Sequence, residues 1–169
     1  MPQVSRPHER PLYNAEILRL AASIPYHKRL TAPMATAERR SPICGSRVTV
    51  DVDMGADGRV AAVGLLVRAC ALGQASSSLL ASSIVGRTPA ELAAARDAIT
   101  AWLARTGEAP DWPGMDVFAP ALDYTARHPS IRLAFEAAAE AAETAANSAS
   151  GHAEVSVTAP ASASAGTDV

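Results

Sequence analysis

The chain has 169 residues, a net charge of -2 and 4% aromatic residues. This length supports one domain with a core of ordinary size and is too short for two. The near balance of acidic and basic residues provides no strong basic field for nucleic acid or anionic lipid. The shortage of aromatic rings also argues against a base-stacking platform. We therefore expect no nucleic-acid partner.

The first ten residues are polar and rich in proline and charge, and they lack the apolar core of a signal peptide. The most apolar run, residues 60–67, is far shorter than the ~20 residues of a membrane span. Two cysteines, Cys44 and Cys70, are too few for a secreted disulfide scaffold. These features predict a cytoplasmic protein with free thiols and no membrane contact.

Residues 12–24 carry apolar side chains at helical spacing, which predicts an amphipathic helix that ends before Pro25. Residues 25–42 contain three prolines and a basic cluster. We expect this segment to be irregular, with one short edge strand near residues 33–38.

Residues 47–54 alternate between apolar and polar side chains, which predicts a strand with one solvated face. Asp51 and Asp53 belong to that face. Residues 55–58 have turn chemistry, and residues 59–67 form a second run typical of a strand. The two runs predict an antiparallel hairpin.

Cys44 precedes this hairpin and Cys70 follows it, so the hairpin's open ends should bring the two cysteines near each other. A helix is predicted from just after Cys70 to about Val85, and it should end at Gly86. Cys70 would then lie at a helix N-terminus, where backbone N–H groups and the helix dipole favour a thiolate. Thiolate is the species that ligates metal or attacks sulfur.

The C-terminal half is helical in its pattern. Thr88 begins a capping box with proline at the first helical position. A short helix is expected at residues 115–124 and an alanine-rich helix at residues 130–146, with Ser130 as its N-cap. From residue 147 the composition reduces to small and polar residues, which predicts a disordered tail.

The order of helix, sheet and helices predicts an α+β fold: a small antiparallel sheet of about three strands with helices packed on one face. The single domain should span residues 11–146. Residues 1–10 and 147–169 should be disordered extensions of it.

Five segments stand in the order and spacing of a known protein family. They are Leu12-Tyr13, Pro42-Ile43-Cys44-Gly45, Cys70-Ala71-Leu72-Gly73-Gln74-Ala75-Ser76-Ser77-Ser78, Gly86-Arg87-Thr88-Pro89-Ala90-Glu91 and His128-Pro129-Ser130-Ile131-Arg132-Leu133-Ala134. In these segments the chain resembles the U-type iron–sulfur cluster assembly scaffolds, the IscU, NifU and SufU family. The resemblance covers roughly residues 12–145 and implies a SufE/NifU-like fold.

The resemblance implies a scaffold, not an enzyme, that receives sulfur from a cysteine desulfurase and passes clusters to apo acceptor proteins. Members hold a small iron–sulfur cluster or zinc on three cysteines and an aspartate, and some add a histidine. Here Ser46 replaces the aspartate and Ser130 replaces the last cysteine. The implied metal ligands are therefore Cys44, Cys70 and His128.

A tetrahedral metal site prefers four donors, and a serine hydroxyl is a poor substitute for thiolate or imidazole. A homodimer could supply four thiolates to a shared [2Fe–2S] cluster, the cargo that we expect, with zinc as the alternative. Two other readings stay open. One is a paralogue that has lost the cluster and serves as an interaction or regulatory module, and the other is a thiol or persulfide relay built on Cys44 and Cys70.

Several other motifs have simpler interpretations. The run Ser76–Ser78 is expected to serve close helix packing, since no Gly-x-Ser-x-Gly elbow accompanies it. The basic clusters at residues 27–29 and 39–40 are expected to be solvated or to dock an acidic partner. Residues 55–58 are expected to form a turn, not a phosphate loop.

Overall fold

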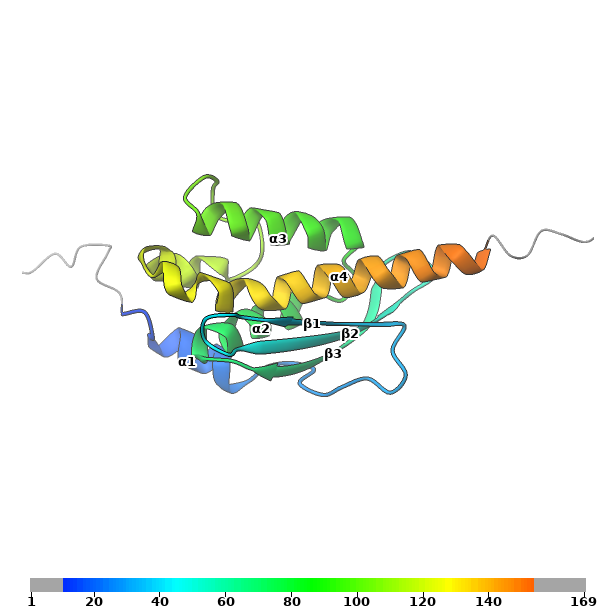
Figure 1. Cartoon of the computed structure of the whole chain (residues 1–169), viewed down its shortest axis with the longest axis horizontal. Helices are drawn as coiled ribbons and strands as arrows, with labels where there is room; N and C mark the ends of the chain where they lie inside the picture. The colour runs from blue at the N-terminus through cyan, green and yellow to red at the C-terminus, as the bar shows by residue number, and fades with distance from the viewer. Residues whose placement is uncertain (1–10, 154–169) are drawn as a thin grey trace, which may run out of the picture.

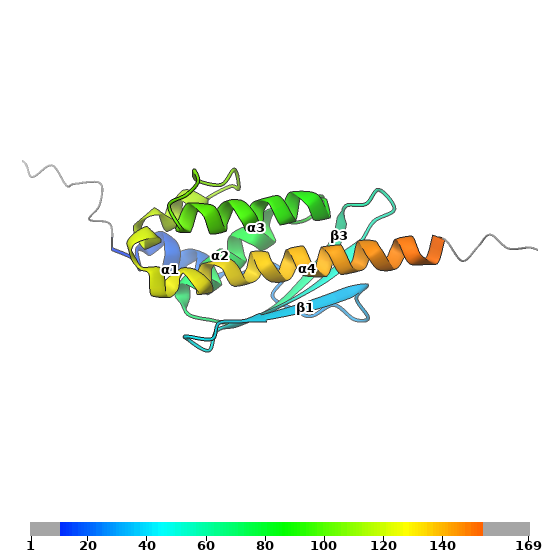
Figure 2. The same ribbon diagram turned by 45° about the horizontal axis from the view of Figure 1, so that its top comes forward.

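The computed structural model describes residues 11–153, in which the helices stack on one face of a single sheet (Figure 1). The sheet is antiparallel with strand order β1-β2-β3, and α4 and α2 cover one of its faces. In turn α3 packs on α4, and α1 packs on α2 (Figure 2). The elements are α1 (Ala15–Ala22), β1 (Ala35–Arg40), β2 (Arg47–Met54), β3 (Val60–Arg68), α2 (Ala71–Ser83), α3 (Pro89–Leu103), the 3-10 helices η1 (Met115–Asp123) and η2 (Thr125–Arg127), and α4 (His128–Ala153). The predicted α+β fold is confirmed.

Local sequence signals set the ends of the first helix and of α3. Asn14 caps α1, because its side chain accepts hydrogen bonds from two backbone N–H groups of the first turn. This helix is shorter than the predicted 12–24. At α3 the capping box forms as predicted, with Thr88 and Glu91 each accepting a bond from the other's backbone N–H.

The inner face of the sheet is the apolar core. Val48, Val50 and Val52 of β2 are fully buried against α4. The central part of α4 presents alanines on several sides, and they are buried because this helix lies between the sheet and α3. Small side chains let helix and sheet approach closely, so the alanine-rich sequence suits this position.

The middle of the outer face of β2, at Thr49 and Asp51, is buried and not solvated, contrary to the prediction. Asp51 is 0% exposed and accepts four hydrogen bonds. Two come from the Arg29 guanidinium at 2.6 and 3.0 Å, one from Leu30 N at 3.0 Å and one from Thr36 Oγ1 at 2.6 Å. Burial by itself raises the pKa of Asp51, but the bonds from Arg29, Thr36 and Leu30 outweigh it and lower the pKa.

The segment between α1 and β1 covers this part of the sheet. A Cβ atom added to Gly64 would lie 2.4 Å from Lys28 O and 2.8 Å from Leu30 N. Leu65 N also donates to Tyr26 O at 3.0 Å. The irregular segment that the prolines predict is therefore bound to the edge and outer face of β3, where only glycine leaves enough room.

The last helix begins earlier and ends later than predicted. It starts at His128, so Ser130 lies within its first turn and is not the N-cap. It continues past Ala146 to Ala153, so the first residues of the predicted tail are helical. Residues 1–10 and 154–169, predicted to be disordered, lie outside the described residues. Within residues 11–153, no helix is both long and apolar enough to cross a membrane.

Candidate functional site

Both cysteines lie at one end of the sheet. Arg47, the first residue of β2, pairs with Arg68, the last residue of β3. Cys44 is in the connection that leads into β2, and Cys70 follows β3 directly. The antiparallel register thus brings the two connections to the same sheet end, as the hairpin predicts. Both thiols are free.

The loop between β1 and β2 holds Cys44 by its own backbone. Ser41 N donates to Ser46 O at 2.8 Å, which closes the loop at its base. The Ser41 hydroxyl accepts from the backbone N–H groups of Ile43 and Cys44 at 3.3 and 3.4 Å. Gly45 has a φ of 68°, a left-handed conformation that favours glycine. The turn leaves Cys44 exposed.

Two further hydroxyls contact the Cys44 sulfur. Ser46 Oγ and Ser130 Oγ each lie 3.1 Å from Cys44 Sγ. Hydrogen bonds from the side chains of Ser130, Ser41 and Ser46 lower the pKa of Cys44 to about 6, because they stabilise the thiolate more than the thiol. At neutral pH this thiol is therefore mostly ionised. Ser41 was not among the predicted site residues, although serine next to Pro42 is a common loop signal.

Ser130 joins the Cys44 loop to the helix that follows Cys70. A Cβ atom added to Gly73 of α2 would lie 3.2 Å from Ser130 O and 2.7 Å from Ala69 Cβ. Ser76 Oγ donates to Ile131 O at 2.6 Å, so α2 and the start of α4 are in direct contact. The helix-packing interpretation of the three serines is confirmed, since all three are buried and bond to backbone carbonyls.

Cys70 has a different setting. It is the N-cap residue of α2, in extended backbone conformation, and its side chain makes no capping hydrogen bond. Its backbone carbonyl accepts from Gln74 N at 2.9 Å. The side chain is half-buried and packs against the core cluster. The predicted location at a helix N-terminus is confirmed.

His128 is the first residue of α4, and its Nε2 lies 2.9 Å from Ala121 O of η1. Throughout residues 11–153, no three His, Cys, Asp or Glu side chains converge as a group able to hold a metal ion. The structure therefore does not assemble Cys44, Cys70 and His128 into a three-ligand site. The donors around Cys44 are hydroxyls.

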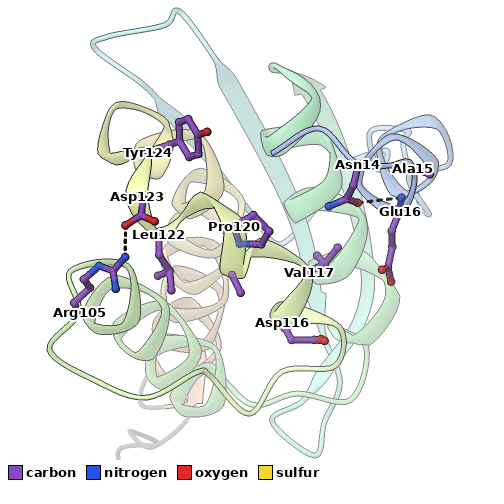
Figure 3. A pocket seen from close by; sticks show the side chains of 11 residues that line it. Asn14, Ala15, Glu16, Arg105, Asp116, Val117, Pro120, Leu122, Asp123 and Tyr124 are labelled. Atoms are coloured by element: carbon purple, nitrogen blue, oxygen red, sulfur yellow. Dashed lines mark hydrogen bonds and ion pairs between the residues drawn. The ribbon is translucent and has the colours of Figure 1, made fainter. Parts of the chain in front are cut away.

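A separate cavity of about 670 Å³ lies between the start of α1, the end of α3 and η1 (Figure 3). Its wall carries the carboxylates of Glu16, Asp116 and Asp123, and Asp123 pairs with Arg105. Neither cysteine lines it. The thiol site is thus a surface loop and not this cavity.

Comparison with known proteins identifies the family. No protein-family model and no curated protein matches the sequence. Among solved structures, the N-terminal part of a nitrogen-fixing NifU-like protein from Brucella abortus is 42% identical, with a TM-score of 0.76. The match covers 80% of this chain and 95% of that one. This chain belongs to the NifU-like, U-type scaffold family.

A second structure has the same fold at low identity. It is described as an iron–sulfur cluster assembly scaffold protein for the SUF system of Fervidobacterium islandicum AW-1. It is 17% identical to this U-type chain, with a TM-score of 0.71, and the match covers 78% of this chain and 96% of that one. The positions at which the family resemblance implied lost ligands, Ser46 and Ser130, are the two that contact the Cys44 sulfur.

Proposed function

We propose that the protein is an iron–sulfur cluster assembly scaffold that receives sulfur on Cys44 and holds iron between Cys44 and Cys70. The observation that carries the proposal is the exposed Cys44 thiol, whose sulfur is contacted by the hydroxyls of Ser46 and Ser130. The 42% identity of the chain to a NifU-like protein supports it. The protein itself catalyses no reaction in this proposal. Its partners are a cysteine desulfurase and apo acceptor proteins, in the cytoplasm.

The sulfur step needs only a persulfide donor. The Cys44 thiolate attacks the outer sulfur of the donor's persulfide, and a new S–S bond forms on Cys44. The donor's S–S bond breaks and its thiolate leaves, so the step involves no net oxidation. Exposure of Cys44 gives the donor access, and the ionised thiol is the reactive form.

Iron is the second part of the cargo, and the donor set limits how it is held. One chain offers two thiolates, and hydroxyls are weak ligands for iron or zinc. Two chains meeting at this sheet end would offer four thiolates, the usual set for a [2Fe–2S] cluster. We therefore include a homodimer around a shared cluster in the proposal.

A second candidate is a sulfur relay that carries persulfide and no cluster. Its support is the absence of a three-ligand group within residues 11–153 and the ring of hydroxyls around Cys44. In this function Cys44 alone passes sulfur from a desulfurase to an acceptor thiol. The chain would then be a family member whose fold has lost the metal.

Anaerobic reconstitution separates the two functions. The full chain is incubated with a purified cysteine desulfurase, cysteine and ferrous iron, followed by absorbance, iron and sulfide analysis and intact mass. A scaffold binds iron and sulfide in stoichiometric amounts, and Cys70→Ala abolishes this. A relay gains only sulfur mass on Cys44 and stays colourless. A protein that gains neither contradicts both candidates.

Restoring the replaced positions provides a matched test. The double variant Ser46→Asp/Ser130→Cys reinstates the carboxylate and the thiolate that the family resemblance implies. If the wild-type protein is a relay, this variant should acquire iron or zinc that the wild type does not retain, as measured by metal analysis after gel filtration. Ser46→Ala/Ser130→Ala is the control, and it should bind no additional metal.

A further inference from the structure

Three arginines form one row across the sheet at the end that carries the cysteines. Arg40 of β1 pairs with Arg47 of β2, and Arg47 pairs with Arg68 of β3. Residues paired directly across strands point to the same face. Val48 faces α4, so its neighbour Arg47, and with it the whole row, lies on the opposite face. In Figure 2, α4 lies on one side of the sheet, and the opposite face is turned away from it.

The row is not neutralised within the described part of the chain. Glu38 is its only carboxylate partner there, with Oε1 2.8 Å from Arg40 Nε and Oε2 3.8 Å from Arg47 Nε. Arg68 is exposed and makes no ion pair or hydrogen bond within residues 11–153. Three arginines and one glutamate leave a charge of +2 here, although the whole chain carries -2.

Folding gains little from this arrangement. Like charges directly opposite each other across strands are unfavourable. The adjacent Arg39 shows the contrast: it lies on the α4 side and pairs with Glu140 at 2.8 Å. The outer row therefore concentrates positive charge where the fold does not use it.

The row and the thiol belong to the same structural unit. The Cys44 loop connects Arg40 to Arg47, and Cys70 comes two residues after Arg68. Any surface that contacts the row lies next to both connections. Ile43, beside Cys44, is 67% exposed and adds an apolar contact point.

We propose that Arg40, Arg47 and Arg68 dock an acidic surface segment of the protein that delivers sulfur to Cys44. The inference rests on the proposed sulfur-accepting function and adds the chemistry of the partner. Guanidinium groups bind carboxylates in bidentate geometry, and a positive patch steers an acidic partner during encounter. The row sets affinity and orientation, while Cys44 performs the chemistry.

The test uses the full chain and a purified cysteine desulfurase as the persulfide donor. Arg40→Gln/Arg68→Gln removes two charges and should raise the KM for sulfur transfer, and the Kd of the complex, about tenfold, with kcat little changed. The affinity of the variant should also depend less on salt. Arg39→Gln is the control, because it removes an adjacent charge from the other face. Thermal unfolding of all variants checks that each is folded.

The outcomes separate this inference from the proposed function. If the wild-type chain neither binds the donor nor takes up sulfur, both fail. If it takes up sulfur and Arg40→Gln/Arg68→Gln transfers with an unchanged KM and salt dependence, only the docking inference is overturned. A polyglutamate peptide should compete with the donor for the wild type and much less for the variant. An RNA oligonucleotide that binds the row more tightly than polyglutamate would also overturn the inference.

Discussion

Cys44 and Cys70 lie in connections at the same end of the sheet, yet the fold gives their thiols different surroundings. Cys44 is exposed in a glycine turn, with hydroxyls from its own loop and from α4 around the sulfur. Cys70 caps a helix by its backbone and packs half-buried against the core. Side-chain hydrogen bonds therefore lower the pKa of the Cys44 thiol. The start of α2 mainly sets the position of Cys70.

The largest expected difference is in sulfur acceptance. Cys44→Ala should lower persulfide formation about 100-fold or more, because the attacking thiolate is lost. Cys70→Ala should retain sulfur uptake on Cys44 and lose iron retention. Intact mass after incubation with a desulfurase and cysteine measures the first effect, and metal analysis measures the second. Equal sulfur uptake by Cys44→Ala and the wild type would place the acceptor at Cys70.

The pH dependence of Cys44 alkylation is the next largest expected effect. With a pKa of about 6, Cys44 is mostly thiolate at pH 7, against about 3% for a thiol with an ordinary pKa of ~8.5. A lower pKa also makes the thiolate less nucleophilic, so the midpoint of the profile is a better readout than the rate. In Cys70→Ala, the rate of iodoacetamide labelling should rise with pH to a plateau, with its midpoint near pH 6. A midpoint above pH 8 would contradict this assignment.

The lowered pKa of Cys44 also makes the stability of the folded protein depend on pH, in a direction that follows from the shift. The folded protein holds the Cys44 thiolate more favourably than the unfolded chain does, so this contribution is fully present above the unfolded pKa of ~8.5. It is lost as the pH falls through about 6, the folded pKa. Denaturant midpoints between these values should therefore rise with pH in the wild type. They should rise less in Cys44→Ala.

Removing the Ser130 hydroxyl tests whether its hydrogen bond lowers the pKa of Cys44. Ser130→Ala should raise the alkylation midpoint of Cys44 by about one pH unit, since a hydrogen bond to a charged group is worth about 1.5–3 kcal/mol and exposure to water reduces it. Ser82→Ala is the matched control, because Ser82 bonds to Ser78 O on α2 and does not contact Cys44. An unchanged midpoint in Ser130→Ala would mean that the loop alone stabilises the thiolate.

The smallest expected effect on the thiol comes from Gly73→Ala, which acts where α2 meets Ser130. The added Cβ would crowd Ala69 and the Ser130 carbonyl, so we expect a stability loss of about 1–3 kcal/mol. The alkylation midpoint should rise less than in Ser130→Ala. Gly151→Ala adds a methyl in open space within α4 and should be neutral or stabilising by up to ~1 kcal/mol. Denaturant unfolding of both variants measures the difference, and equal stability would contradict the close contact.

Local signals predicted the elements around the site well. The alternation over Arg47–Met54 gives a strand with those same bounds, and the Thr88 capping box forms as expected. The location of Cys70 at a helix start was also predictable. These features depend on neighbours within a few residues, because a strand's period and a helix cap are short-range properties.

The outer face of the sheet shows where local reasoning failed. Asp51 has the alternation of a solvated residue, but it is buried under a segment more than 20 residues away in sequence. Alternation of apolar and polar residues predicts which side chains share a face of the strand. It does not predict what covers that face. Burial of a charge depends on a distant partner, here Arg29, that no local pattern identifies.

By itself, the sequence determined the α+β class, the hairpin with a cysteine at each open end, and the family resemblance that the 42% identical structure supports. Only the tertiary structure decided that Ser130 meets Cys44, that His128 bonds to Ala121 O, and that three arginines form one row. The reason is physical. Periodicity and capping act within a turn or a strand, whereas a thiol's environment is built by groups up to 86 residues apart that the packing of α4 on the sheet brings together.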